Sequence, residues 1–226
     1  MKKYMSIILF LLIYQHPFDD DVVKGVDMLK TQKSTILHIK NTSNTEGAEA
    51  LSVVFPEVIR WNAFKDFFET EANIVLYVKK GSAWADFSIG QFQMKPSFIE
   101  ELEKYVAEHD ALKMFSYISI SEKSDIESRK ARVYRMSQID WQLRYAHVYW
   151  LAAKDVFKKR KFKNAKERVH FFATAYNYGF QKPESEIESW QKRKCFPFGS
   201  KHKGEQVGFG DLAVEFFNKY ATEFEQ

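Results

Sequence analysis

A run of apolar residues spaced three and four positions apart limits the fold of this chain more than any other feature. Such spacing places side chains on one face of an α-helix. The run consists of Val133, Met136, Ile139, Leu143, Ala146, Trp150, Ala153 and Phe157. It predicts one long helix packed against the rest of the domain. The same spacing from Ala48 to Trp61 predicts a second buried helix, bent by Pro56 because proline lacks a backbone donor.

Two shorter segments interrupt this helical pattern. Residues 34–40 and 116–120 resemble strands, the first because its apolar residues alternate with polar ones. We therefore expect a mainly α (α+β) fold. A small extended region around residues 83–93 should form one wall of a groove.

The composition is that of a single domain. The chain has 226 residues, of which 45% are hydrophobic, so it can bury one sizeable core. A net charge of +4 favours an anionic polymer or surface without requiring nucleic acid. The basic run Lys158–Lys163 is more typical of a solvated helix end than of a nucleic-acid site. Cys195 is the one cysteine, so no internal disulfide can form.

The N-terminus has the pattern of an export signal. Met1–Lys3 carries charge and residues 4–14 are apolar, a run too short to span a membrane comfortably. We expect residues 1–18 to be a signal peptide. No small-residue cleavage site follows, so retention as an N-terminal membrane anchor stays open. Residues 19–226 would then form one domain in the periplasm or cell envelope.

The stretch from Ala85 to Phe98 is the hardest part of the chain to explain as scaffold. It mixes polar, glycine and aromatic positions with neither helical nor strand periodicity. Gly90 lets backbone approach a neighbour or ligand closely, and Gln93 offers both a donor and an acceptor. A helix is predicted to follow, with Ser97 as its cap and Glu100 closing a capping box. These features indicate a site on a bend that leads into a helix.

A second polar cluster is predicted at the end of a later helix. Asn164 is a typical helix start and Gly179 a typical helix end. Tyr176 and Asn177 therefore fall in the last turn. There the Tyr176 ring could face a sugar and its hydroxyl could form a hydrogen bond.

Glu57 is the candidate acid. It lies on the flank of the apolar face of the predicted 48–61 helix, where partial loss of water would raise its pKa and keep it protonated near neutral pH. It could equally be an ordinary surface glutamate beside a proline bend. Glu69 and Glu71 are alternatives in a predicted helix over residues 62–80, Glu71 within its apolar face and Glu69 away from it.

Three features in this order resemble one superfamily. Gly90-Gln91-Phe92-Gln93 is similar to the Gly-Leu-Met-Gln motif of soluble lytic transglycosylases and goose-type lysozymes. Ala175-Tyr176-Asn177-Tyr178-Gly179 resembles their Ala-Tyr-Asn-Ala-Gly motif, and Glu57 precedes both. The resemblance covers roughly residues 48–179. Val58, where these enzymes usually have serine, is one departure, and the acid lies closer to the glycine motif in the family than Glu57 does here.

The resemblance implies a lysozyme-like fold and a cell-wall substrate. Glu57 would be the single catalytic acid and base of a lytic transglycosylase that cleaves the β-1,4 bond between N-acetylmuramic acid and N-acetylglucosamine. Ser88, Gln93, Tyr176 and Asn177 would bind the peptidoglycan glycan strand. No metal or other cofactor and no nucleic acid are expected. An envelope-associated complex is a possible partner, and membrane contact is expected only through the N-terminal segment.

Two other readings stay open. A lysozyme-type hydrolase needs a second carboxylate, for which Asp86 is the candidate, although Asp86 could instead bond to nearby backbone amides. Alternatively, the protein is a non-catalytic cell-wall binding or assembly protein that has the groove without the chemistry.

Overall fold

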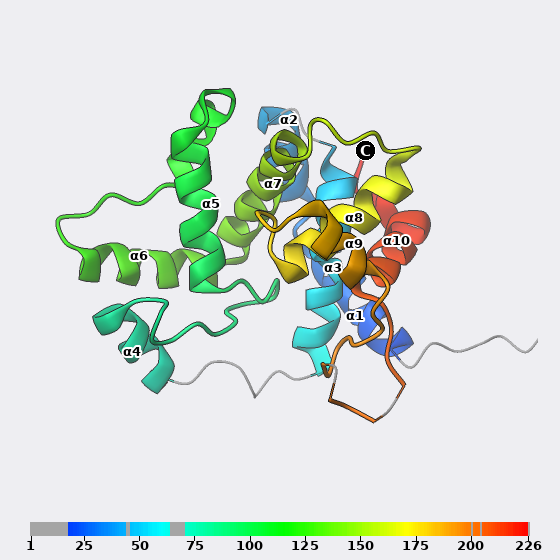
Figure 1. Cartoon of the computed structure of the whole chain (residues 1–226), viewed down its shortest axis with the longest axis horizontal. Helices are drawn as coiled ribbons and strands as arrows, with labels where there is room; N and C mark the ends of the chain where they lie inside the picture. The colour runs from blue at the N-terminus through cyan, green and yellow to red at the C-terminus, as the bar shows by residue number, and fades with distance from the viewer. Residues whose placement is uncertain (1–17, 44–45, 64–70, 200, 204, 226) are drawn as a thin grey trace, which may run out of the picture.

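The chain folds into a set of packed helices in a computed structural model that describes residues 18–43, 46–63, 71–199, 201–203 and 205–225 (Figure 1). The α-helices are α1 (Asp19–Thr31), α2 (Lys33–Ser43), α3 (Gly47–Ala63), α4 (Glu71–Lys80), α5 (Pro96–Glu108), α6 (Asp125–Ser137), α7 (Ile139–Val156), α8 (Ala165–Tyr178), α9 (Glu184–Gln191) and α10 (Phe209–Tyr220). Two 3₁₀-helices are η1 (Asp110–Ile118) and η2 (Ala221–Phe224). The prediction of a mainly helical protein is confirmed.

The predicted β content is wrong. Residues 34–40 belong to α2, and most of residues 116–120 belong to η1. Their apolar side chains are too few to distinguish a short strand from a helix by spacing alone. In the described part of the chain, pairing is limited to two isolated bridges, Ile89 with Met94 and Phe196 with Val207. The wall predicted at residues 83–93 is therefore a loop closed by one bridge.

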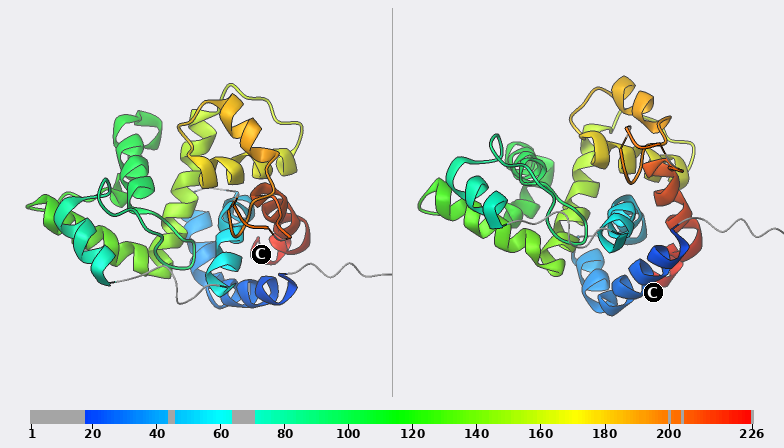
Figure 2. Two further views of the ribbon diagram at one scale, coloured as in Figure 1. Left: turned by 60° about the horizontal axis from the view of Figure 1, so that its bottom comes forward. Right: turned by 90° about the horizontal axis from the view of Figure 1, so that it is seen from below.

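Helix α3 is the centre of the main core. It packs against α1, α7, α8 and α10, and Figure 2 shows it enclosed by these helices. Its apolar side chains are almost wholly buried, and the Phe55 ring stacks on Phe216 of α10 with centroids 4.0 Å apart. Pro56 lies inside the helix, as predicted. Any polar group that α3 carries on these faces is removed from water.

The predicted long helix is two helices. Gln138 adopts an extended conformation (φ −100°, ψ 124°) and separates α6 from α7. It is neither glycine nor proline, so the sequence gives no signal for the break. The sequence also predicts a charged linker over residues 121–130, but α6 begins within it, at Asp125 after the cap residue Ser124.

A smaller cluster joins α4, α5 and α6 beside the main core. Arg132 of α6 forms two hydrogen bonds with the Glu103 carboxylate of α5, at 3.1 and 2.7 Å, and a third with the Tyr77 hydroxyl of α4, at 2.9 Å. Tyr77, Val78 and Ala85 form its apolar part. Arg132 and Glu103 are both buried, so their pairing satisfies charges that would otherwise be costly to bury.

Only part of the predicted 62–80 helix can be compared with the structure. Asn62 belongs to α3 and α4 starts at Glu71, whereas Glu69 lies outside the described residues. Glu71 is exposed, so its expected position within an apolar face is wrong. The buried residues of α4 are Tyr77 and Val78, near the opposite end of the helix.

Two predicted helix caps are wrong and two helix ends are confirmed. Pro96 opens α5 with Lys95 as its cap position, and Ser97 and Glu100 form no capping box. The sequence also predicts Asp211 as the cap of the last helix, but Gly208 is the residue that precedes α10. Asn164 does cap α8 by accepting from the Glu167 N–H at 3.0 Å, and Gly179 ends that helix. None of the helices described is long and apolar enough to cross a membrane.

Candidate functional site

Glu57 is a buried carboxyl on the central helix. It follows Pro56 in α3, and 4% of its surface is exposed. Burial raises the pKa of Glu57 above its ordinary value of 4.5, because an ionised carboxylate loses its hydration there. The prediction of a partly desolvated boundary position understated this burial, since α8 and α10 both cover α3. The alternative of an ordinary surface glutamate is therefore wrong.

Three neighbours act in the opposite direction on the pKa of Glu57. The Arg60 guanidinium, one turn along α3, lies 3.3 Å from Oε1 and 3.1 Å from Oε2 of Glu57. Its charge, the Asn177 amide and the charge of Lys95 each favour the carboxylate. The loss of hydration is the larger effect, so the pKa is raised on balance. Oε2 is buried and forms the ion pair with Arg60, but it accepts no hydrogen bond from the described residues.

Gln142 of α7 holds the turn that contains Gly90 with two hydrogen bonds. The Gln142 carbonyl oxygen accepts from the Phe92 N–H at 2.8 Å, and its amide donates to Gln91 at 3.0 Å. Gly90 has φ of +69°, and a Cβ there would collide with the Gln142 side-chain amide. The close approach expected at this glycine is therefore to a protein side chain.

Gln93 presents an unpaired acceptor at the end of that turn. It has φ of +48°, an uncommon conformation for a residue with a side chain, and its amide donates to the Gly90 carbonyl at 2.9 Å. The buried Oε1 of Gln93 has no hydrogen-bond partner within the described chain. Buried acceptors are usually satisfied, so this atom is a candidate ligand contact.

Tyr176 is oriented differently from the prediction. Its hydroxyl donates to the Phe92 carbonyl at 2.9 Å, and its ring packs against Phe98 and Tyr149 with centroids 4.9 and 5.2 Å away. The side chain is 8% exposed. Tyr176 therefore joins α8 to the glycine turn, and its ring is not free to lie flat against a sugar.

Asn177 lies beside Glu57 with its amide orientation fixed. The Trp190 indole N–H of α9 donates to Asn177 Oδ1 at 3.1 Å. An indole N–H can only donate, so the carbonyl side of the amide faces Trp190 and the amino side is available to Glu57. A donor at that position lowers the pKa of Glu57, which agrees with this orientation.

One cavity of about 140 Å³ brings the predicted residues together. It is lined by Glu57, Arg60, Ser88, Gln93, Met94, Lys95, Phe98, Tyr176 and Asn177. All five predicted site residues are in this set, although they come from α3, the loop that contains Gly90 and α8. The sequence reasoning missed Arg60, Met94, Lys95 and Phe98. Arg60 could have been found, because it lies three residues after Glu57 in a predicted helix and so shares its face.

Two further hollows adjoin this cavity. One of about 390 Å³ shares Lys95, Phe98, Tyr176 and Asn177 with it, and one of about 220 Å³ shares Arg60 and Asn177. Shared walls make the three hollows neighbours, with the Glu57 cavity common to both. Asn177 lines all three hollows.

Asp86 does not line the Glu57 cavity. Its two oxygens accept from the Ser97 backbone N–H at 3.0 Å and from the Ser97 hydroxyl at 2.8 Å. Asp86 thereby binds the first turn of α5, in the position where Ser97 was expected to act, and it lines the adjoining larger hollow. The interpretation of Asp86 as a backbone-bonded loop acid is the one this geometry favours.

The described residues contain no group of three or more His, Cys, Asp and Glu side chains that could hold a metal ion. The basic run Lys158–Lys163 follows α7, and its Arg160 pairs with Glu184 and Glu188 of α9 at 3.0 and 2.7 Å.

Comparisons with protein-family models, with curated proteins and with solved structures gave no match.

Proposed function

We propose that the protein cleaves the glycan strands of peptidoglycan with Glu57 as its single catalytic acid and base, on a lysozyme-like arrangement of helices. One observation carries the proposal: the cavity that contains the buried Glu57 carboxyl is also lined by Gln93 and Asn177. A buried carboxyl with a raised pKa beside amide groups suits proton donation to a glycosidic oxygen. Amides suit recognition of sugar hydroxyl and acetamido groups.

The reaction would proceed in two proton transfers. Protonated Glu57 gives its proton to the oxygen that leaves C1 of N-acetylmuramic acid, and the C1–O bond breaks. The resulting carboxylate takes the proton of the 6-hydroxyl, whose oxygen bonds to C1 and gives a 1,6-anhydro sugar. No water is consumed, and Glu57 ends protonated as it began.

The shortage of carboxylates supports this outcome over hydrolysis. Glu57 is the one acidic side chain among the residues that line the central cavity. Asp86, the candidate second carboxylate, is held by Ser97 and lies 3.9 Å from Lys95. Hydrolysis with retention or inversion would need a second carboxylate across the sugar ring.

Arg60 supports a second candidate function. A guanidinium 3.1 Å from Oε2 favours the ionised form of Glu57 and could make the pair a structural one. In that case the groove would bind cell-wall glycan without cleaving it. The two candidate functions differ in whether the protein with Glu57 intact releases cleavage products from peptidoglycan.

Digestion of purified peptidoglycan tests the proposal. We expect the wild-type protein to release anhydro-muropeptides, and Glu57→Gln to reduce that rate by roughly 10²–10⁴-fold, the usual contribution of a general acid. Glu71→Gln is the matched control, since Glu71 is an exposed glutamate on α4. Glu69→Gln tests the remaining alternative acid.

Each product pattern has a distinct meaning. Products with a free reducing end and no anhydro form would favour the hydrolase, provided that Asp86→Asn abolishes them while keeping the thermal stability of the wild type. Equal binding to peptidoglycan without product, in wild type and Glu57→Gln alike, would favour the binding protein. Loss of activity in Glu69→Gln with Glu57→Gln unaffected would move the acid to residue 69.

The substrate requires a location outside the cytoplasm. Export to the periplasm or cell envelope through residues 1–18 therefore belongs to the same proposal, and those residues lie almost entirely outside the described part of the chain. Detection of the mature N-terminus in the envelope fraction checks it.

A further inference from the structure

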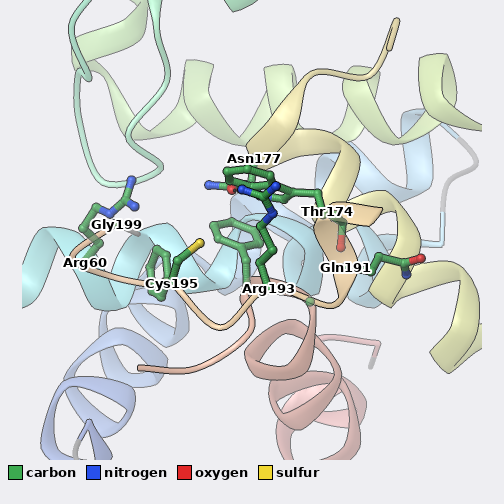
Figure 3. A pocket seen from close by; sticks show the side chains of 11 residues that line it. Arg60, Thr174, Asn177, Gln191, Arg193, Cys195 and Gly199 are labelled. Atoms are coloured by element: carbon green, nitrogen blue, oxygen red, sulfur yellow. Dashed lines mark hydrogen bonds between the residues drawn. The ribbon is translucent and has the colours of Figure 1, made fainter. Parts of the chain in front are cut away.

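The hollow beside the catalytic cavity has an unusual charge. Its volume is about 220 Å³, and it is lined by Arg60, Thr174, Asn177, Trp190, Gln191, Arg193, Cys195, Phe196, Gly199, Phe209 and Gly210. Two of these side chains are guanidinium groups and none is a carboxylate. Figure 3 shows Arg60 arriving from α3 and Arg193 from the segment after α9, on different sides of the hollow.

Arg193 has no carboxylate partner among the residues that the structure describes. The ion pairs found in those residues do not include it. Its guanidinium lies over the Trp190 ring, 4.7 Å from the centroid, and the Tyr178 ring stacks on Trp190 at 4.9 Å. Stacking on an aromatic face holds a guanidinium in place while leaving its edge donors available.

Arg60 contributes a second positive charge when Glu57 is protonated, which is the form that the proposed reaction needs. Its guanidinium lies over the Phe196 ring at 4.6 Å, donates to the Pro197 carbonyl at 3.3 Å and contacts Glu57. When Glu57 is protonated, it no longer offsets this charge. A hollow with two guanidiniums then faces the ligand.

The surrounding segment strengthens the positive field. Exposed basic residues follow one another there, and residues 192–203 contain no acid. They are Lys192, Arg193, Lys194, Lys201 and Lys203. Clustered charges of one sign attract an oppositely charged ligand and fall in effect as salt rises.

We propose that this hollow, called here the Arg193 subsite, binds an anionic group, a carboxylate or a phosphate, carried by the ligand whose glycan lies at Glu57. The assignment of the glycan rests on the proposed function, whereas the anion site rests on Arg60, Arg193 and the absence of acidic lining residues. Planar guanidinium groups match both anions through paired N–H donors. Peptide-stem carboxylates and wall-polymer phosphates are the two sources of that chemistry.

Calorimetry on the full chain tests the subsite with three short probes. The first is the disaccharide of N-acetylglucosamine and N-acetylmuramic acid with a stem peptide bearing free carboxylates, which lacks the bond proposed to be cut. The second is the same molecule with its carboxylates amidated. The third is a ribitol-phosphate oligomer.

We expect amidation and Arg193→Gln each to weaken binding of the peptide probe about five- to tenfold, the effect of a partly exposed charged hydrogen bond. Together they should weaken it no further than either alone. Lys201→Gln is the matched control, because it removes one charge of the same segment but not a residue lining the hollow, and it should change binding less than twofold. Equal melting temperatures establish that both variants are folded.

The remaining outcomes identify the source or overturn the proposal. Phosphate binding lost in Arg193→Gln, with no effect of amidation, assigns the site to a phosphate polymer. Equal weakening by Arg193→Gln and Lys201→Gln, or equal binding of all three probes, overturns the subsite. Cleavage of peptidoglycan without any anion dependence sinks the subsite alone, whereas anion binding without cleavage sinks the proposed reaction alone.

Discussion

The Glu57 carboxyl is subject to opposing influences that sequence could show only in part. Its place on the flank of a buried helix was visible from the spacing of apolar residues, and so was its order before the two motifs. The extent of its burial depends on α8 and α10, which lie far away in sequence. Its pairing with Arg60 follows from helical spacing. Which neighbouring charge has the larger effect on the pKa of Glu57 is set by the packing around Glu57 and Arg60.

Replacing Glu57 by glutamine should stabilise the fold at neutral pH. The pKa of Glu57 is raised in the folded state by burial, so the native protein binds more protons than the unfolded chain between pH 4.5 and that raised value. Stability therefore falls as pH rises through this window, and the loss is complete above it. Glu57→Gln should raise the free energy of unfolding at neutral pH, with no gain below pH 4.

Glu49 provides a matched control on the same helix. Its carboxylate accepts two hydrogen bonds from Arg168, at 2.9 and 2.6 Å, and it is also buried. Glu49→Gln should destabilise the fold by about 1–3 kcal/mol, because it weakens a paired interaction with a guanidinium. Denaturant unfolding across pH measures both variants, and a Glu57→Gln protein less stable than wild type at pH 7 would contradict the prediction.

Trp190 should act on Glu57 through Asn177. Trp190→Phe keeps an aromatic ring beside Tyr178 but removes the N–H that fixes the Asn177 amide. The amide can then turn and withdraw its donor, which would raise the pKa of Glu57 further. If Glu57 acts as an acid, the alkaline limb of the pH–activity profile should move to higher pH. Trp84→Phe, at an exposed tryptophan, should leave the profile unchanged.

At the scale of elements, interior segments were more predictable than their ends. The helices over α3 and α8 are predicted with nearly correct bounds, since each has an apolar face and a recognisable start or end. The cap of α5 was not, because its first turn is bonded by Asp86, eleven residues earlier than Ser97. The break at Gln138 and the helical state of residues 34–40 were equally hidden, because tertiary contacts decide them.

The glycine turn gives an element-scale prediction with an internal control. Gly90→Ala should destabilise the protein by about 2–4 kcal/mol, because it combines an unfavourable positive φ with a Cβ that collides with Gln142. Gly199 also has a positive φ, of +87°, but a Cβ there would meet nothing within 4 Å. Gly199→Ala should therefore cost about 1 kcal/mol. Chemical denaturation compares the two, and equal losses would show that the Gln142 contact is not rigid.

At the scale of the molecule, the buried apolar side chains form a large core and a separate small cluster. The large core surrounds α3, whereas Tyr77, Val78 and Ala85 form the apolar part of the small one. The buried pairs of Arg132 with Glu103 and Tyr77 hold the small cluster together. None of this division was foreseen, since the sequence suggested one continuous domain with a single core.

The difference in core size predicts unequal local stability. Amide protons of α4 should exchange with solvent through an opening that costs less free energy than global unfolding, because few apolar side chains are buried there. Amides of α3 and α8 should exchange only with global unfolding. Native-state hydrogen exchange at increasing denaturant measures this, and a common opening energy for α4 and α3 would contradict it.

Burial of Glu57 opposes three neighbours that favour its ionised form, and this opposition has a consequence for how the pKa of Glu57 responds to a bound ligand. In the free protein burial outweighs the opposing effects of Arg60, Asn177 and Lys95, so the pKa of the carboxyl is already raised. A polysaccharide lying over the cavity would cover Lys95 and Arg60, whose side chains are 54% and 22% exposed. On the proposed function, a bound glycan would change the hydration of the carboxyl and of these two cations together, so the pKa of Glu57 should differ between the free and the occupied protein.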